Sequence, residues 1–408
     1  MVITKKMTVT TADFITMDLV CFCHLRWDFV YQRPQHLLSR FASKFRVFYI
    51  EEPCFHKGED SYQINHTAES VWVVTPYLSD VEANEMELIV RQKNLLNKLF
   101  RKMEIEKYIF WYYTPMALKV SDQFKPVRII YDCMDELSAF KFAPTEITSL
   151  EKRLFSIADL VFTGGHHLFE AKQHCHHNIH PFPSSIDKEH FSKARADVND
   201  PDDQVMIPHL RIGFYGVIDE RFNIKLIGEV ATQRPDWHFI LIGPVIKILP
   251  EELPVNKNIH YLGPKNYQEL PTYLAGWDIA MVPFEKNEST RYISPTKTPE
   301  YLAGGKPVIS SSIRDVVKPY GEQGLVHIAD TTEDFIAAVE KELNTIDKSD
   351  WNKKVDAFLS QISWDKTWNR MMKLVDEQLP VVKPLRKVAS SVIAQDIVTP
   401  MQVNKKAV

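Results

Sequence analysis

The chain has 408 residues, of which 45% are hydrophobic and 25% charged, and its 49 basic and 53 acidic residues leave a net charge of −4. This composition is that of a globular protein with room for two ordinary domains, and it excludes a fibrous or disordered class. Because the charge is nearly balanced, there is no overall field to hold a nucleic acid backbone, and we expect no nucleic acid partner.

The first residues lack the uninterrupted apolar stretch of a signal peptide, and no later stretch approaches the ~20 apolar residues of a membrane span. The five cysteines are scattered and never spaced as C-x-x-C, which is typical of reduced thiols. We therefore expect a cytoplasmic protein, with a peripheral position on the inner face of the cell membrane as an alternative.

Short apolar runs alternate with segments of helical spacing along the whole chain. This alternation predicts an α/β fold of two doubly wound, Rossmann-like domains with a cleft between them. The expected buried strands lie at 19–25, 46–52, 71–78, 108–113, 128–134 and 160–165, and then at 211–217, 238–244, 259–264, 279–284, 306–312 and 325–329.

The predicted boundaries follow changes in composition. An N-terminal domain is expected over 1–190, and an aspartate-rich linker over 191–209 leads to a second domain over 210–362. A helix over 363–380 carries an apolar stripe that could pack back on the first domain, and a poorly ordered tail is expected over 381–408.

The stretch "SPTKTPEYLAGGKPVISSS", residues 294–312, places a lysine and a glutamate where a helix should begin. Thr298 before Pro299 predicts the N-cap, so that Lys297 and the first amides form an anion site. Glu300 would repel a phosphate and is better interpreted as an acceptor for sugar hydroxyls. A diphosphate next to a ribose satisfies both groups; an ordinary helix start with a solvated lysine and glutamate is the alternative.

The stretch "RIGFYGVIDERFNIKLI", residues 211–227, runs from a strand through Gly213 and Gly216 into a helix. Phosphates are held at such first turns of doubly wound domains, where glycine permits close approach of the backbone. Arg221 could bind a phosphate in bidentate fashion, or it could simply pair with Asp219 or Glu220.

Four stretches, "GFYGVIDERFN", "RPDWHFILIGP", "IHYLGPKNYQELPTYLAGWDIAMVPF" and "SPTKTPEYLAGGKPVI", resemble the donor-binding domain of GT-B glycosyltransferases of the retaining, family-four type. "WDFVYQRPQHLLSRF" and "IIYDCMDELSAF" resemble its bacterial surface-polysaccharide and teichuronic-acid branch. The resemblance covers most of residues 18–380. It implies an acceptor-side first domain, a second domain that binds a nucleoside-diphosphate sugar, with UDP preferred to GDP, and a polysaccharide or lipid-linked acceptor.

The resemblance also assigns residues. The ribose-binding glutamate of the family falls on Glu300, and the diphosphate contacts fall on the turn at Ser294, Thr296, Lys297 and Thr298, with Gly216 and Arg221 from the glycine loop. The base would lie against Gly243, Pro244 and residues 264–267, including Tyr267. The family's first motif glutamate falls on Tyr292, and its glycine–arginine pair appears as Gly216–Val217, so the contact to the donor sugar is altered.

Family members stabilise the leaving nucleoside diphosphate with fixed cations and helix ends, so neither a cofactor nor a metal is expected here. Lys297 and Arg221 are the catalytic cations on this interpretation, and retention follows by resemblance. An inverting enzyme would need a base, and Asp135 is the first candidate, ahead of Asp132, Asp28 and His24. A structural, turn-capping role is the alternative for each of these residues.

The first domain offers "HLRWDFVYQRPQHLL" where a glycine-rich turn is common. Its residues Arg26, Trp27, Asp28, Tyr31 and Arg33 suit a sugar face and an anionic acceptor group, with interdomain packing and ion pairs as the alternative.

Two further patterns could indicate binding sites but are better explained by ordinary structural roles. Six histidines and a cysteine between His166 and His180 match no standard zinc spacing, so a polar helix end is preferred to a metal site. The basic amphipathic segment 91–107 could contact an anionic membrane, but a solvated helix that packs its leucines on the first domain is favoured.

Two alternatives to a transferase stay open. A GT-B epimerase would use the same nucleotide grip on the donor sugar, and a degenerate nucleotide-sugar-binding module would lack turnover. Product analysis without an acceptor would separate the first from a transferase, and the absence of turnover on any donor would favour the second.

Overall fold

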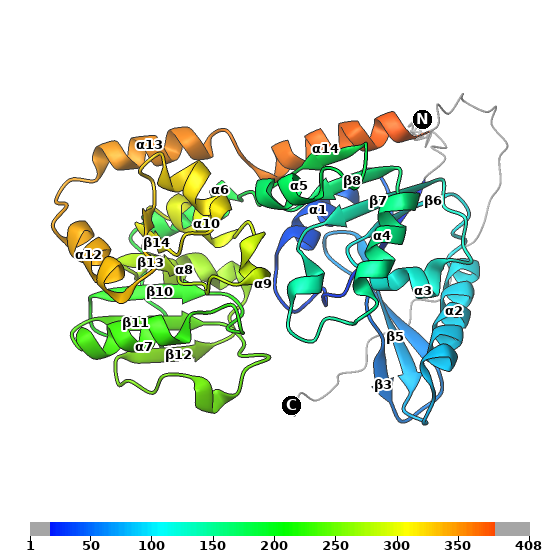
Figure 1. Cartoon of the computed structure of the whole chain (residues 1–408), viewed down its shortest axis with the longest axis horizontal. Helices are drawn as coiled ribbons and strands as arrows, with labels where there is room; N and C mark the ends of the chain where they lie inside the picture. The colour runs from blue at the N-terminus through cyan, green and yellow to red at the C-terminus, as the bar shows by residue number, and fades with distance from the viewer. Residues whose placement is uncertain (1–16, 380–408) are drawn as a thin grey trace, which may run out of the picture. The chain divides into compact units, whose positions relative to one another are not determined.

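Two β-sheets organise the chain, one built from its first half and one from its second (Figure 1). The structure is a computed structural model, and it describes residues 17–379. These residues belong to one compact unit. The predicted tail at 381–408, and the first 16 residues of the predicted first domain, lie outside the described residues.

The first sheet has the strand order β3-β5-β2-β1-β6-β7-β8-β9, with β4 paired antiparallel to β5 and the other neighbours parallel. Its strands are β1 (Asp18–Phe22), β2 (Arg46–Ile50), β3 (Cys54–His56), β4 (Ser61–His66), β5 (Val71–Ser79), β6 (Tyr108–Tyr112), β7 (Arg128–Cys133), β8 (Leu160–Thr163) and β9 (Ile179–Pro181).

The second sheet is parallel throughout, in the order β12-β11-β10-β13-β14-β15. Its strands are β10 (Arg211–Tyr215), β11 (His238–Ile242), β12 (Ile259–Gly263), β13 (Ile279–Val282), β14 (Val308–Ser310) and β15 (His327–Ile328).

Helices connect the strands and cover the sheets. The α-helices are α1 (Arg33–Phe41), α2 (Glu85–Lys102), α3 (Leu118–Ser121), α4 (Ile147–Ile157), α5 (His166–Lys172), α6 (Lys188–Ser192), α7 (Ile224–Gln233), α8 (Leu270–Ala275), α9 (Glu288–Arg291), α10 (Lys297–Ala303), α11 (Arg314–Val316), α12 (Thr332–Leu343), α13 (Ser349–Leu359) and α14 (Trp364–Gln378). Short 3-10 turns lie at Pro115–Ala117, Leu137–Ala139, Lys193–Arg195, Pro250–Glu252 and Tyr267–Glu269, and a π-helical turn at Val317–Gly321.

The strands form because their apolar runs can be buried on both faces. In β1, Val20 and Phe22 join the apolar cluster on one face of the first sheet, and Leu19 and Cys21 join the cluster on the other. A strand covered on both faces appears in the sequence as a continuous apolar run, not as an alternation. This arrangement confirms the two doubly wound sheets that the sequence predicts.

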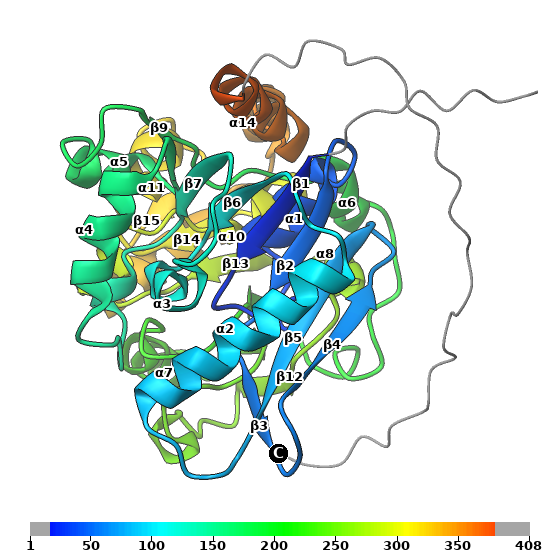
Figure 2. The same cartoon turned by 90° about the vertical axis from the view of Figure 1, so that its right-hand side faces the viewer.

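The chain crosses between the two sheets at two places. Phe191, Ala194 and Ile207, from the segment predicted as a linker, are buried in the core of the second sheet. After α13 the chain returns to the first half, where α14 buries Trp364 and Met371 in the core of the first sheet, and α14 lies against α1. Figure 2 shows α2 running along the same sheet, in front of β2 and β5.

Candidate functional site

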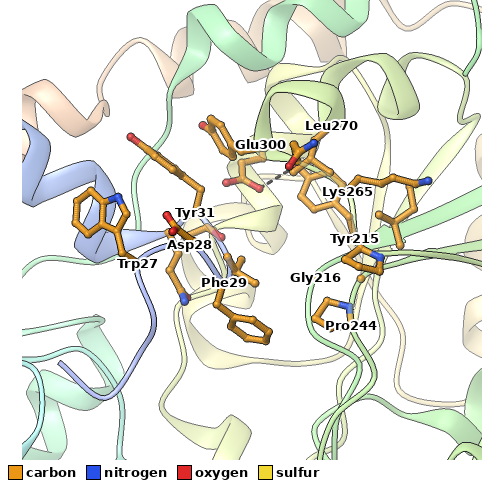
Figure 3. Close-up of a pocket in the computed structure, with 18 of the residues that line it drawn as sticks. Trp27, Asp28, Phe29, Tyr31, Tyr215, Gly216, Pro244, Lys265, Leu270 and Glu300 are labelled. Carbon is orange, nitrogen blue, oxygen red and sulfur yellow. Dashed lines mark hydrogen bonds between the residues drawn. The ribbon is translucent and has the colours of Figure 1, made fainter. Parts of the chain in front are cut away.

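A cavity of about 680 Å³, which we call the first cavity, lies where strands of both sheets end. From the first half of the chain it is lined by residues 27–32, after β1, and by residues 65–69, at the end of β4 and in the turn to β5. From the second half it is lined by Tyr215 and Gly216 at the end of β10, by residues 242–244 at the end of β11, by residues 264–267 after β12, and by Leu270, Thr296, Lys297 and Glu300 (Figure 3). Ligands of doubly wound sheets bind at these carboxyl ends.

Two glycines let the strand ends of the second sheet come close together. Gly216 has φ +138° and Gly243 has φ +142°, a region that side chains disfavour. A Cβ on Gly243 would lie 1.9 Å from the carbonyl oxygen of Gly216, and a Cβ on Gly216 would lie 2.2 Å from Cε of Lys297. Glycine at both positions is therefore what allows the lysine to lie directly over the turn.

Lys297 is a cation without an anionic partner among the described residues. Its ammonium lies 5.6 Å from the ring centre of Phe214 and 5.8 Å from that of Phe284. Burial lowers the pKa of Lys297 to about 8, although Glu300 counteracts this shift. An anion that binds beside a lysine in this environment stabilises its charged form, so such binding is favourable.

Glu300 lies one turn along α10 from Lys297 and also lines the first cavity. Its Oε2 accepts a hydrogen bond of 2.9 Å from the hydroxyl of Tyr215, the dashed line in Figure 3. Burial raises the pKa of Glu300 to about 7, against the influence of Lys297. The free carboxylate oxygen can accept a hydrogen bond from a ligand hydroxyl.

The helix that carries both residues begins earlier than the sequence suggests. The prediction that Thr298 is the N-cap is wrong, because α10 starts at Lys297 and Thr296 is the capping residue. Thr298 is fully buried and its hydroxyl has no partner among the described residues, while the amide of Glu300 donates to the carbonyl of Thr296. Pro299 therefore occupies the third helical position, where a missing N–H is still tolerated. At its other end α10 stops at Ala303, before Gly304, and Gly305 follows with φ +73°.

Arg221 is held by Asp219 in a two-pronged ion pair, with Nε at 3.0 Å from Oδ1 and Nη2 at 2.7 Å from Oδ2. This is the pairing that the sequence left open as an alternative to phosphate binding. The guanidinium also lies 5.3 Å from the ring centre of Phe140. Arg221 still lines a space of about 130 Å³ together with Lys297, Ser294 and Asp135.

Asp135 follows β7 and lines this small space as well as a second cavity of about 490 Å³. Burial raises the pKa of Asp135 to about 6, and Arg221 and Arg33 limit the rise. A carboxyl group with a pKa in this range can take up or release a proton near neutral pH. The second cavity also contains Phe29, Phe140 and Phe142, whose rings offer flat faces.

The residues predicted on the acceptor side of the first domain separate into two groups. Trp27, Asp28 and Tyr31 line the first cavity, and the ring of Tyr31 stacks on that of Tyr267 across it at 4.6 Å. Arg26 lines none of the three spaces described so far, because its guanidinium binds Glu51 and the carbonyl of Glu52.

Arg33 lines the small space beside Asp135, but its nitrogens are already engaged. Its Nε and Nη2 bind Asp132, with Nη2 2.8 Å from Oδ1, and its Nη1 donates to the carbonyl of Phe182. The Arg33–Asp132 pair is buried, so it fixes the wall of the site and presents no free charge to a ligand.

Tyr292 lies outside these three spaces. Its ring packs on His167 at 4.9 Å, and the guanidinium of Arg291 lies 5.3 Å from its centre. The side chain at the position of the family's first motif glutamate thus packs on α5 and lines none of these three spaces.

Some lining residues escaped the sequence reasoning. The segment 65–69 enters the first cavity from the first sheet, and its signal was the alternation in "YQINH" before a second β-rich run. Phe140 and Phe142 lie in a loop after β7. Phe140 ends the stretch "IIYDCMDELSAF", but the sequence assigned a role to neither residue.

Residues 17–379 contain no group of three or more histidine, cysteine, aspartate or glutamate side chains placed to hold a metal ion. In the histidine-rich segment, His176 and His180 are engaged with the carbonyl of Ala158 and the side chain of Asn178. The same described part of the chain has no helix long and apolar enough to cross a membrane.

Part of the chain matches a known protein family. Residues 211–345 match the family described as "Glycosyl transferases group 1". A putative teichuronic acid biosynthesis glycosyltransferase, TuaH, from Bacillus subtilis (strain 168) is 26% identical over 289 residues, which cover 66% of this chain and 72% of that protein.

Solved structures share the fold at low identity. Sucrose-phosphate synthase from Thermosynechococcus elongatus superposes with a TM-score of 0.67 at 13% identity, over 88% of this chain and 98% of that one. HepE from Anabaena, in complex with UDP and glucose, gives 0.64 at 12% identity, over 88% and 99%. An Escherichia coli trehalose-6-phosphate structure bound with UDP-2-fluoro glucose gives 0.63 at 11% identity, over 90% and 99%.

The fold is therefore GT-B, and the protein is a glycosyltransferase. Within that class, its sequence is similar to that of the Bacillus enzyme named above.

Proposed function

We propose that this protein transfers a sugar from a nucleoside-diphosphate sugar, UDP before GDP, to a polysaccharide or lipid-linked acceptor, without a metal and with retention at the anomeric carbon. The observation that carries the proposal is the pair on α10. Lys297, a cation with no anionic partner among the described residues, and Glu300, a carboxyl group with a free oxygen, line the same cavity. A diphosphate attached to a ribose complements both.

Support for the nucleotide comes from the shape of the second sheet's edge. Gly216 and Gly243 expose backbone beside Lys297, where a diphosphate can approach closely. Pro244, Lys265 and Tyr267 follow the next strands along and offer flat or hydrogen-bonding groups for a base. The solved structures of HepE and of the E. coli protein contain UDP or a UDP sugar, which favours UDP here.

Charge drives the transfer that we propose. The bond between the anomeric carbon and the diphosphate oxygen breaks, and Lys297 offsets the charge that develops on the departing oxygen. Arg221 contributes less, because Asp219 already offsets its charge. The acceptor hydroxyl forms the new bond on the face that the diphosphate leaves, and its proton passes to a leaving diphosphate oxygen. Asp135 lies between the small space and the second cavity, where it can orient that hydroxyl.

The second cavity favours a transferase over an epimerase. An epimerase needs no room for a second substrate, whereas about 490 Å³ beside Asp135 is enough for a sugar residue. The relative's name suggests a glycan of the cell envelope as the product. Peripheral contact with an anionic membrane is part of the proposal through Lys98 and Arg101 on α2, which are not in ion pairs with described residues.

A thermal-shift screen with UDP, GDP, ADP and their sugars tests the proposal. A ligand at 100 times its Kd stabilises a protein by about 2.7 kcal/mol. We expect stabilisation by UDP or GDP and by at least one sugar conjugate, and release of nucleoside diphosphate that requires an acceptor. If no nucleotide stabilises the protein, the proposal fails. If the sugar is epimerised without an acceptor, the result favours an epimerase over a transferase.

A further inference from the structure

A third cavity, of about 350 Å³, lies in the first half of the chain between α2, α3 and the ends of β1, β2 and β6. Most of its wall is apolar, with Phe22, Ile50, Phe55, Leu88, Ile89 and Met116 among the lining side chains. None of these residues has a role in the binding of the donor proposed above.

The apolar residues of helix α2 lie in two different environments. Leu96, Leu99 and Phe100, in its second half, are buried in the core of the first sheet, and Leu96 also lines the third cavity. In its first half, Glu85, Leu88, Ile89 and Gln92 face the third cavity, at the spacing of one helical face. Leu88 and Ile89 therefore remain partly exposed along an open space.

The third cavity adjoins the second one. Glu52, Thr114 and Met116 line both, so the two spaces meet at the ends of β2 and β6. The second cavity in turn reaches Asp135. A molecule that binds with its polar end beside Asp135 can thus extend an apolar end along α2.

The outer part of the third cavity is open to solvent. Phe55, on β3, lines this cavity and is 58% exposed, and Leu88 and Ile89 line it from α2 and are partly exposed. Apolar groups gathered on a surface in this way commonly mark a binding site.

We propose that the third cavity binds the hydrocarbon chain of an amphiphilic acceptor whose polar head, with the reacting hydroxyl, lies beside Asp135 in the second cavity. The inference rests on the proposed function and names the acceptor class: a lipid-linked acceptor, not a free polysaccharide. Three basic residues of the second cavity, Lys141, Lys247 and Arg221, face three acidic ones, Glu52, Asp135 and Asp219, so charge alone selects no head group there. The hydrocarbon chain must therefore provide the selectivity for the acceptor.

The test uses alkyl glucosides of six, eight and ten carbons as probes, below their micelle concentrations, with the full-length protein saturated with UDP. Each methylene group buried in an apolar site improves affinity about fourfold. We expect the Kd to fall by roughly this factor per carbon until the cavity is filled. A Kd that does not depend on chain length contradicts the inference.

Two substitutions on adjacent residues of α2 form a matched pair. Ile89→Glu places a carboxylate in the third cavity, while Val90→Glu places it on the same helix turn but outside the cavity lining. The chain-length dependence should disappear in Ile89→Glu and persist in Val90→Glu, with UDP affinity unchanged in both. If both variants keep it, the chain does not bind here.

Binding to vesicles with anionic lipids separates a membrane surface from a chain site. If both variants lose vesicle binding but keep the chain-length dependence, Ile89 contacts the membrane surface and not the hydrocarbon chain of the acceptor, and the inference is overturned. Unchanged UDP affinity in Ile89→Glu shows that the variant is folded. The proposed function fails by a different result, the absence of UDP binding to the unaltered protein.

Discussion

Lys297 should lower the stability of the folded protein and raise its affinity for the nucleotide donor. Its pKa is lowered to about 8 from an ordinary 10.5, so the folded protein disfavours the charged lysine. The resulting cost in folding free energy is present below pH 8 and disappears as the pH rises from about 8 towards the pKa of the unfolded chain. Lys297→Met removes this cost and keeps a side chain of similar length. We therefore expect the variant, without nucleotide at pH 7, to be more stable than the parent by about 1–3 kcal/mol.

The same substitution should weaken nucleotide binding. A hydrogen bond from a charged group contributes about 1.5–3 kcal/mol, so the Kd for UDP should rise roughly 10- to 150-fold. Because only the charged lysine attracts the diphosphate, the affinity of the parent protein should also fall as the pH rises above 8, and that of the variant should not.

Isothermal titration with UDP and urea unfolding measure the two effects on the same samples. Lys225→Met is the matched control, since Lys225 is exposed on α7 with 84% of its side chain accessible and should change neither quantity. A Lys297→Met variant that binds UDP as the parent does, or that is less stable than the parent without nucleotide, would refute the assignment.

Three further predictions follow from the cavity. Glu300 has a pKa raised to about 7, so the affinity for a UDP sugar should fall as the pH drops through 7 and the carboxylate that accepts the ligand's hydrogen bond becomes protonated. Glu300→Gln should bind the UDP sugar roughly 10-fold more weakly at pH 7.5, and titration calorimetry should show no dependence of its affinity on pH. Gly216→Ala and Gly243→Ala should cause similar backbone strain, but Gly216→Ala should reduce UDP affinity more, because the new Cβ meets the movable end of Lys297. The Cβ of Gly243→Ala meets backbone instead, so this variant should have the lower melting temperature. Equal effects of the two substitutions on UDP affinity and on melting temperature would contradict this geometry. Asp135→Asn should lower kcat at least 10-fold and leave the Kd for UDP unchanged in steady-state kinetics and titration, and a change confined to the Kd would place Asp135 on the donor instead.

The sequence predicted the parallel strands well, because strands covered on both faces form continuous apolar runs that stand out between helices. β1 to β15 include each of the twelve expected strands. The missed elements are β3, β4 and β9, which are short or lie near the edge of the first sheet. Strands there can expose one face, as the partly exposed pattern of β4 shows, so their sequences carry a weaker apolar signal.

The site was predictable where function constrains the backbone. Gly216 and Gly243 have positive φ, and Lys297 and Glu300 lie on one helix face, so residue type and spacing pointed to them. The register of α10 was wrong by two residues, because Thr296 and Thr298 are both plausible caps and only tertiary packing, which buries Thr298, separates them. The engagement of Arg33 by Asp132 joins residues 99 positions apart, and no local pattern encodes it.

A crystal structure of the protein with UDP tests the central claim most directly. The account predicts the diphosphate within hydrogen-bonding distance of Nζ of Lys297, the ribose hydroxyls on Glu300, and the base beside Pro244 and Tyr267. UDP bound elsewhere, or in the first cavity without contact to Lys297 and Glu300, would contradict it.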